Sequence, residues 1–247
     1  MWVDINMHLE LMSGPPDQVL KDARAADVDY IATGTHPKQW RWLEGRAPHV
    51  AFGLHPRYLT DESDWLMTLE DLLHRDEQRA VGEIGLDFRS GMPKADRQIR
   101  VFENQLSLAQ SLDRAVIIHT VKSHHEVIAS LKRVRCKRFV IHAFTGSRDI
   151  AQTYLSLGGY LSAGGLITRE PRPRVVSVFQ SIPKERILLE TDAPDLPIVG
   201  HRHGSPAHLP QIGGALAAVL GFSELALQLL STQNAQRLFD YDFFQSN

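Results

Sequence analysis

Eight short apolar segments, rich in β-branched and aromatic residues, recur along this chain of 247 residues and constrain its fold more than any other feature. Their starts lie roughly 20–35 residues apart, the length of a strand followed by a helix. Strands that are apolar on both faces and alternate with helices predict a parallel sheet covered by helices. The predicted strands are Val3–His8, Tyr30–Thr35, Val50–His55, Ala80–Leu86, Ala115–Val121, Phe139–Phe144, Tyr160–Gly165 and Ile187–Ala193.

Eight strands are also the number that closes a (β/α)8 barrel. The alternative is an open doubly wound sheet, which normally carries a G-x-G-x-x-G turn after its first strand. Residues 9–16, which follow the first predicted strand, lack that pattern. We therefore predict an α/β fold, a single (β/α)8 TIM-type barrel that forms one domain over residues 1–247.

Two serines mark predicted helix starts between these strands. Ser123 is followed three residues later by Glu126, the spacing of a capping box. Ser147, with Asp149 in the first turn, marks the start of the next helix. Both serines are expected to accept a hydrogen bond from the first turn of their helix.

Composition and charge exclude several classes of protein. The chain has 27 Lys and Arg against 29 Asp and Glu, a formal net charge of −2, which excludes a polybasic protein that coats nucleic acid but permits an enzyme that grips a few phosphates. Cys136 is the single cysteine, which excludes a disulfide framework and a thiolate zinc site, and it is expected to be buried. The first residues do not resemble a secretory signal and the longest apolar run, 212–222, is too short to span a bilayer, so a cytoplasmic location is expected, with no membrane partner.

Histidines and carboxylates gather where the predicted strands end. Because the carboxyl ends of all barrel strands meet at one face, side chains far apart in sequence converge there. A lone histidine at such a place is more often a structural residue, and His36 and His55 are not assigned as metal ligands from position alone. His124 and His125 are expected at a helix surface, and His201 and His203 in an exposed loop. The strand-end residues are His8, His36, His55, His119, His142, Glu83 and Asp192.

Five of these residues form the predicted metal site: His8, Glu83, His119, His142 and Asp192. Imidazoles and carboxylates without thiolates are typical of a site for divalent metal ions. Cations would offset the cost of burying the carboxylates and would lower the pKa of bound water toward about 7. Glu83 is the best-placed residue to bridge two ions, and Asp192 is a candidate ligand and proton acceptor.

Several motifs, taken in order, are similar to those of the TatD-type metal-dependent deoxyribonucleases, within the amidohydrolase-like barrel hydrolases. They are Asp4-Ile-Asn-Met-His8, Gly53-Leu-His-Pro56, Val81-Gly-Glu-Ile-Gly-Leu-Asp87, Ile118-His119, Ile141-His-Ala-Phe-Thr-Gly-Ser147, Leu189-Glu-Thr-Asp-Ala-Pro194, Ser205-Pro-Ala-His-Leu209 and Asn234-Ala-Gln-Arg-Leu-Phe239. This resemblance covers nearly the whole chain.

The resemblance implies a barrel with one or two divalent ions, Mg, Mn or Zn, that hydrolyses phosphodiester bonds, often as an exonuclease on single-stranded or frayed DNA. It implies that Glu83 bridges the ions. His119 and His142 would hold one ion, and His8 and Asp192 the other. His55 would lie near the substrate.

Three residues depart from the family pattern. Asn6 stands where the first histidine of His-x-His is usual, and an amide oxygen is a poorer ligand than imidazole for metals that prefer nitrogen. Lys122 follows the fifth strand where an Arg-Asp pair is frequent, so it can contact a phosphate only as a point charge. Asp195 replaces an aromatic residue. These departures concern rate and substrate preference more than fold.

Two other functions stay open at this point. One is a metal-dependent barrel hydrolase that cleaves an ester, amide or phosphate of a small molecule, which the near-neutral charge favours. The other is a catalytically weak binding protein, which Asn6 suggests. The basic run at residues 132–138 precedes the sixth strand and is expected on the opposite barrel face, whereas Arg169, Arg172 and Arg174 follow the seventh strand and are candidate phosphate contacts.

Overall fold

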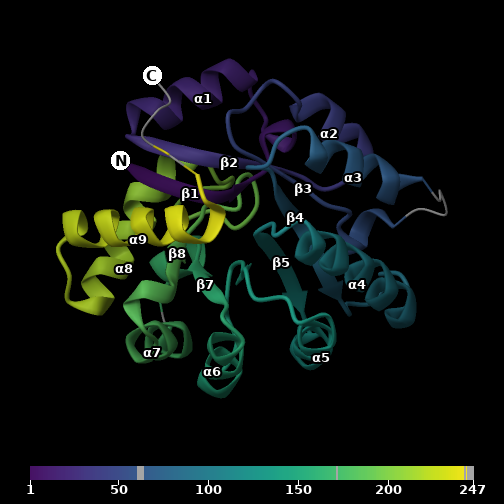
Figure 1. The fold of residues 1–247 in the computed structure, drawn as a ribbon. Coiled ribbons are helices and arrows are strands. Elements are labelled where there is room, and N and C mark those ends of the chain that lie inside the picture. Colours follow the sequence, from purple (N-terminus) through teal and green to yellow (C-terminus); the bar gives the residue numbers. More distant parts are fainter. Residues whose placement is uncertain (60–63, 171, 242, 244–247) are drawn as a thin grey trace.

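The computed structural model describes residues 1–59, 64–170, 172–241 and 243. Eight strands form one sheet in sequence order, and each neighbouring pair is parallel. The sheet curls into a nearly closed barrel surrounded by helices, which confirms the predicted TIM-type barrel (Figure 1). The strands are β1 (Trp2–Met7), β2 (Val28–Gly34), β3 (Val50–Phe52), β4 (Ala80–Asp87), β5 (Val116–Val121), β6 (Phe139–Ile141), β7 (Tyr160–Ala163) and β8 (Ile187–Leu189).

A helix follows each strand and covers the outside of the barrel (Figure 1). The face of α4 that carries Phe102, Leu106 and Ala109 is fully buried, because these residues recur at helical spacing against the sheet. The helices are α1 (Pro16–Ala25), α2 (Pro37–Leu43), α3 (Trp65–His74), α4 (Ala95–Ser111), α5 (His124–Val134), α6 (Arg148–Ser156), α7 (Pro173–Ser181), α8 (Leu209–Leu220) and α9 (Glu224–Phe239).

The inside of the barrel is a packed core that is closed at the end where the strands begin. Alternate strand residues such as Ile5, Ile31 and Ile117 fill it, as the two-residue period of a strand requires. Phe239 and Tyr241, at and after the end of α9, pack below this layer, and the Tyr241 hydroxyl donates to the Val50 carbonyl. Any open site must therefore lie at the other end, where the strands finish.

The barrel has a seam between its last and first strands. Among the described residues, β8 and β1 share no ladder of paired residues, unlike every other neighbouring pair. Two backbone hydrogen bonds cross the seam just beyond the strand ends, from His8 N to Ala193 O (2.8 Å) and from Asp192 N to Asn6 O (3.0 Å). The Asp4 carboxylate also accepts from the backbone nitrogen of Thr191 at 3.0 Å. Side chains and loops close the barrel here.

Three strands end at least three residues earlier than predicted. We expected strands through His55, Phe144 and Ala193, but β3, β6 and β8 end at Phe52, Ile141 and Leu189. The backbone leaves the sheet beyond these points, and both Ala143 (φ 44°) and Asp192 (φ 53°) adopt left-handed conformations that a strand does not allow. His55, His142 and Asp192 consequently lie on loops at the carboxyl face.

The two predicted helix starts behave differently. Ser147 caps α6 and accepts a hydrogen bond from Ile150 N, as predicted. Ser123 precedes α5, but its hydroxyl donates to the Leu86 carbonyl at 2.7 Å instead of capping the helix, so the predicted capping box is wrong. The bond to Leu86 ties the start of α5 to β4.

Cys136 is 4% exposed, as expected of a buried cysteine. No single helix among the described residues is long and apolar enough to cross a membrane. The segments Pro206–Leu220 and Glu224–Phe239 reach that length and composition only together, and they are bent at 106°.

Candidate metal centre

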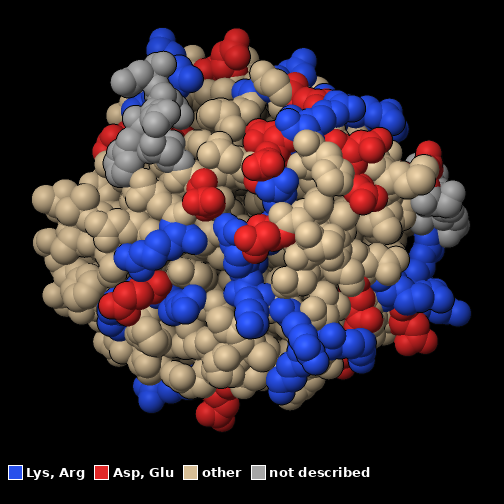
Figure 2. All heavy atoms as spheres, in the orientation of Figure 1, with Lys and Arg blue, Asp and Glu red and all other residues tan. Residues whose placement is uncertain are grey.

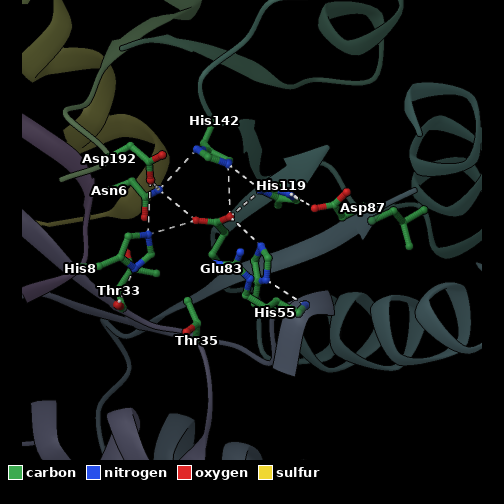
Figure 3. A network of polar contacts seen from close by, with 12 residues as sticks. Asn6, His8, Thr33, Thr35, His55, Glu83, Asp87, His119, His142 and Asp192 are labelled. Carbon is green, nitrogen blue, oxygen red and sulfur yellow. Dashed lines mark hydrogen bonds and ion pairs between the residues drawn. The ribbon is translucent and has the colours of Figure 1, made fainter. Parts of the chain in front are cut away.

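The five predicted ligands converge at the carboxyl face of the barrel (Figure 3). His8 follows β1, Glu83 lies within β4, His119 lies within β5, and the other two lie on the loops after β6 and β8. All are buried apart from His119, whose side chain is 12% exposed. Polar side chains this deep need partners, because an unpaired buried charge is costly.

Glu83 lies at the centre and provides those partners. Its Oε1 faces three imidazoles, with His119 Nδ1 at 2.8 Å, His142 Nε2 at 3.2 Å and His55 Nε2 at 3.3 Å. Its Oε2 faces His8 Nε2 at 3.4 Å and Asn6 Nδ2 at 3.2 Å. The two oxygens of one carboxylate thus face two different sets of side chains.

Two groups of ligating atoms share Glu83. In each group the ligating atoms lie within 4.8 Å of one another. One group joins His8, Glu83 and Asp192, with 3.3 Å between His8 Nε2 and Asp192 Oδ1. The other joins His55, Glu83 and His119. His142 lies beside this second group, with its Nε2 at 3.1 Å from His119 Nδ1. The structure therefore adds His55 to the residues near the shared carboxylate.

The surroundings of Asn6 indicate whether these residues suit a cation. Its side chain is fully buried, and its amide nitrogen donates to Glu83 Oε2 and to Asp192 Oδ1, both at 3.2 Å. Its Oδ1 has no hydrogen-bond partner among the described residues, although a buried acceptor normally has one. Two carboxylates, an imidazole and an amide whose oxygen accepts no hydrogen bond from the described residues together form a donor set that fits a divalent cation.

A second layer of contacts orients the imidazoles. The Thr33 carbonyl lies 3.1 Å from His8 Nδ1, and Glu190 Oε1 lies 3.2 Å from His142 Nδ1, so each ring presents Nε2 to Glu83. Asp87 Oδ2 lies 3.5 Å from His119 Nε2. Such outer partners fix the ring orientation of metal ligands.

Asp87 and Glu190 are not among the predicted site residues. Both are fully buried carboxylates. The signal in the sequence that could have identified them is a carboxylate at the end of an apolar strand, where an ionisable residue is rare. Glu190 also accepts a hydrogen bond from the Ser162 hydroxyl at 2.6 Å, and burial raises its pKa. Arg89 holds Asp87 with two hydrogen bonds of 2.9 Å from its Nε.

The charges of the cluster are strongly coupled. Burial opposes a charge on His8, but contacts with Asp192 and Glu83 outweigh it and raise the His8 pKa to about 10. Glu83 and Glu190 likewise raise the pKa of His142 well above its ordinary value against the effect of burial. Burial would raise the pKa of Glu83, but the surrounding histidines, His142 first, hold it well below its usual range. The carboxylates therefore favour the charged forms of His8 and His142 in the metal-free centre, whereas burial lowers the pKa of His55.

A cavity of about 100 Å³ opens onto Glu83 and the histidines. Arg57 and Tyr58 line it from the turn after β3, Arg89 lines it from the loop after β4, and Asp195 lines it from the loop after β8. Lys122, the predicted substrate contact, is exposed after β5 and is not among the described residues that line the cavity. Two arginines that the sequence analysis did not single out lie at the cavity instead.

Comparison with known proteins assigns the chain to a family. The family described as TatD related DNase matches residues 3–240. The chain belongs to the TatD family. It is 32% identical over 259 aligned positions to the 3′-5′ ssDNA/RNA exonuclease TatD of Klebsiella pneumoniae, with 97% of each chain covered.

Two further comparisons concern YjjV of Escherichia coli. Its sequence, that of an uncharacterized metal-dependent hydrolase, is 38% identical over 233 residues, with 89% of this chain and 88% of that protein covered. The crystal structure of YjjV, a TatD homologue, superimposes with a TM-score of 0.90 at 29% identity and 98% coverage of each chain. Together with the buried ligand groups, these relatives identify a TatD-family metal-dependent hydrolase.

The other histidines of this TatD-family chain lie apart from the centre. His36 is half-buried and packs edge-on against Tyr58, with ring centroids 4.8 Å apart. His125, His201 and His203 are exposed, as expected. His124 is not a surface residue as we expected, because it is half-buried with its Nδ1 3.1 Å from the Tyr154 hydroxyl.

The basic segments lie away from the cavity. Residues 132–138 include the end of α5 and precede β6, on the barrel face opposite the centre, and Lys and Arg side chains gather over α5 in Figure 2. Arg169 donates to the Pro197 carbonyl and Arg172 to the Arg169 carbonyl, so both stabilise the loop after β7. Arg174 is exposed in α7. Arg57 and Arg89 are therefore better placed for substrate.

Proposed function

We propose that this protein hydrolyses phosphodiester bonds at the ends of single-stranded nucleic acid, with one or two divalent metal ions as cofactors. The observation that carries the proposal is the pair of ligand groups that share the Glu83 carboxylate at the carboxyl face of the barrel. A carboxylate shared in this way suits two cations that clamp one phosphate. The similarity to the exonuclease of Klebsiella pneumoniae supports the choice of a single-stranded substrate.

The proposed ligands are His8 and Asp192 with Glu83 for one ion, and His119 and His142 with Glu83 for the other. His55, 3.3 Å from Glu83, is proposed to contact the substrate or to complete the second group. When bound, the cations would stabilise the negative charge that develops on the phosphate and acidify water at the centre. Glu83 keeps the charge that this requires, since the surrounding histidines, His142 first, hold its pKa well below its usual range against the effect of burial.

Asp192 is the proposed general base. The oxygen of a water molecule forms a bond to phosphorus as the bond from phosphorus to the leaving sugar oxygen breaks, and the Asp192 carboxylate takes the proton from that water. Asp192 Oδ1 faces the cluster through contacts with His8 and Asn6.

Arg57 and Arg89 are proposed to hold the phosphate. Both line the cavity, and two guanidinium groups offer the planar, paired donors that suit phosphate oxygens. Arg89 is held by Asp87, which also contacts His119, so the position of this guanidinium is linked to that of the imidazole. These two residues take the part that the sequence analysis assigned to Lys122.

The decisive experiment is Glu83→Gln, with Glu185→Gln as the matched control, because Glu185 is exposed and lies on the turn before β8. Each protein is given Mg²⁺, Mn²⁺ or Zn²⁺ and a single-stranded oligonucleotide labelled at its 5′ end. We expect cleavage from the free 3′ end by the wild-type and control proteins, and at least a ~100-fold loss in Glu83→Gln. Undiminished cleavage by Glu83→Gln would exclude Glu83 from the chemistry.

A second candidate function is hydrolysis of a small phosphate ester or other small ester. The size of the cavity favours it, because about 100 Å³ accommodates a phosphoryl group but is smaller than a typical ligand pocket of roughly 300–1,000 Å³. A chromogenic phosphodiester and monoester, assayed beside the oligonucleotide, separate the two functions. Turnover of the small esters without oligonucleotide cleavage would support this candidate, and no metal-dependent turnover of either would support a binding protein.

A further inference from the structure

Four polar atoms from four residues face one another in the first ligand group (Figure 3). Glu83 Oε2 and Asp192 Oδ1 are each approached by His8 Nε2, at 3.4 and 3.3 Å. The same two oxygens are each approached by Asn6 Nδ2 at 3.2 Å. Three of these atoms are ordinary metal ligands, and the fourth is an amide N–H donor, which cannot bind a cation.

The two carboxylates determine how the Asn6 amide points. A primary amide can turn over by rotation about its Cβ–Cγ bond, which exchanges the positions of its nitrogen and oxygen. Here the nitrogen faces the carboxylates, which accept its protons. The oxygen is buried and has no hydrogen-bond partner among the described residues, so no contact found for that oxygen favours the present orientation.

A cation between these atoms would reverse the preference. It would repel the amide N–H groups and attract the amide oxygen, and rotation of the amide would bring Oδ1 to the place that Nδ2 now takes. The resulting donor set has one nitrogen, from His8, and three oxygens, from Glu83, Asp192 and Asn6. Oxygen-rich sets suit Mg²⁺ and Mn²⁺, whereas each added imidazole favours Zn²⁺.

We propose that the Asn6 amide turns over when a cation binds, becomes its fourth protein ligand, and shifts the selectivity of this site toward Mg²⁺ or Mn²⁺ and away from Zn²⁺. This inference rests on the metal centre of the proposed function but not on the choice of substrate. Measurement of cation binding in the absence of substrate tests the inference. If the inference about Asn6 fails, the cleavage experiments above still test the proposed function.

The first test compares wild-type protein with Asn6→His and Asn6→Ala, using calorimetric titration with Mn²⁺ and with Zn²⁺. We expect Asn6→Ala to weaken Mn²⁺ binding by about tenfold or more, as loss of a supporting group does at other metal sites. We expect Asn6→His to raise the ratio of Zn²⁺ to Mn²⁺ affinity by about tenfold or more. Asn104→His, an exposed position on α4, measures the zinc affinity that a surface histidine adds.

An unchanged affinity ratio in Asn6→His, or unchanged Mn²⁺ binding in Asn6→Ala, would overturn the proposal. Nuclear magnetic resonance of wild-type protein with ¹⁵N-labelled asparagine provides a test that needs no variant to fold. On saturation with Mg²⁺, the Asn6 side-chain protons should move upfield as their hydrogen bonds to the carboxylates are lost, while those of Asn104 and Asn234 stay. Asn6 protons that keep their position would show that the amide has not turned.

Discussion

Some side chains around the centre orient the predicted metal ligands, and Glu190 is the clearest case. It lies 3.2 Å from His142 Nδ1 and turns the ring so that Nε2 faces Glu83. We predict that Glu190→Gln weakens metal affinity by about 10–100-fold. Activity should recover at high metal concentration, because the proposed reacting groups are intact. Titration of activity and of bound metal measures this, and a loss that excess metal does not restore would contradict a positioning role.

Asp195 adds a negative charge to the cavity from the loop after β8, whereas Arg57 and Arg89 line it from the segments after β3 and β4. A carboxylate there repels an anionic substrate. We predict that Asp195→Asn lowers KM for an oligonucleotide by about two- to fivefold at low salt, the range expected for one exposed charge, with kcat unchanged. The effect should fade as salt screens the charge. A KM that is insensitive to this substitution at low ionic strength would place Asp195 away from the path of the substrate.

Some residues of the metal centre were predictable from the sequence, because each of them interrupts an apolar strand. His8, Glu83 and His119 stand out because a buried strand rarely carries an ionisable side chain. The roles of Arg57 and Asp87 were not predictable, since their contacts depend on how neighbouring loops fold over the strand ends. The orientation of the Asn6 amide depends on two carboxylates, Glu83 and Asp192, that are 77 and 186 residues away.

At the scale of elements, the eight strand starts were predictable within two residues, but three strand ends were not. Apolar residues follow closely on Phe52 and Ile141, and Ala193 follows Leu189 after three polar residues, so the sequence does not mark where pairing stops. The actual limit is set by the backbone conformations at Ala143 and Asp192, which turn these segments out of the sheet. The packing of Tyr241 against the opposite end of the barrel was also not predictable from the sequence.

The pairing of β4 with β5 depends on Gly85, which lies opposite His119 in the ladder. Its φ is 149°, and a Cβ atom there would lie 2.0 Å from the His119 carbonyl oxygen. We predict that Gly85→Ala destabilises the fold by about 3 kcal/mol, through backbone strain and displacement of β5. Urea denaturation measures the loss. Gly91→Ala is the control, because its φ is also positive, at 86°, but a Cβ atom there meets no described atom within 4 Å.

For the whole molecule, metal binding should be coupled to protons. The His8 pKa is raised to about 10, so its charged form stabilises the metal-free fold below pH 6.5, and that contribution is lost as pH rises toward 10. A cation requires the neutral ring, so binding at neutral pH must release protons and must strengthen as pH rises from 6 to 8. Calorimetry in buffers of different ionisation enthalpy counts those protons. A heat of binding that is independent of the buffer would contradict the assigned charge states.

The position of the first ligand group relative to the seam has a mechanical consequence. His8 follows the first strand and Asp192 follows the last, and only a few backbone hydrogen bonds join these strands. An ion bound by both side chains would link the first strand of the sheet to the last. Removal of the ion by a chelator should then make it easier for β1 and β8 to separate. Hydrogen exchange should accelerate on chelation for the amide protons of β1 and β8 more than for those of β4 and β5.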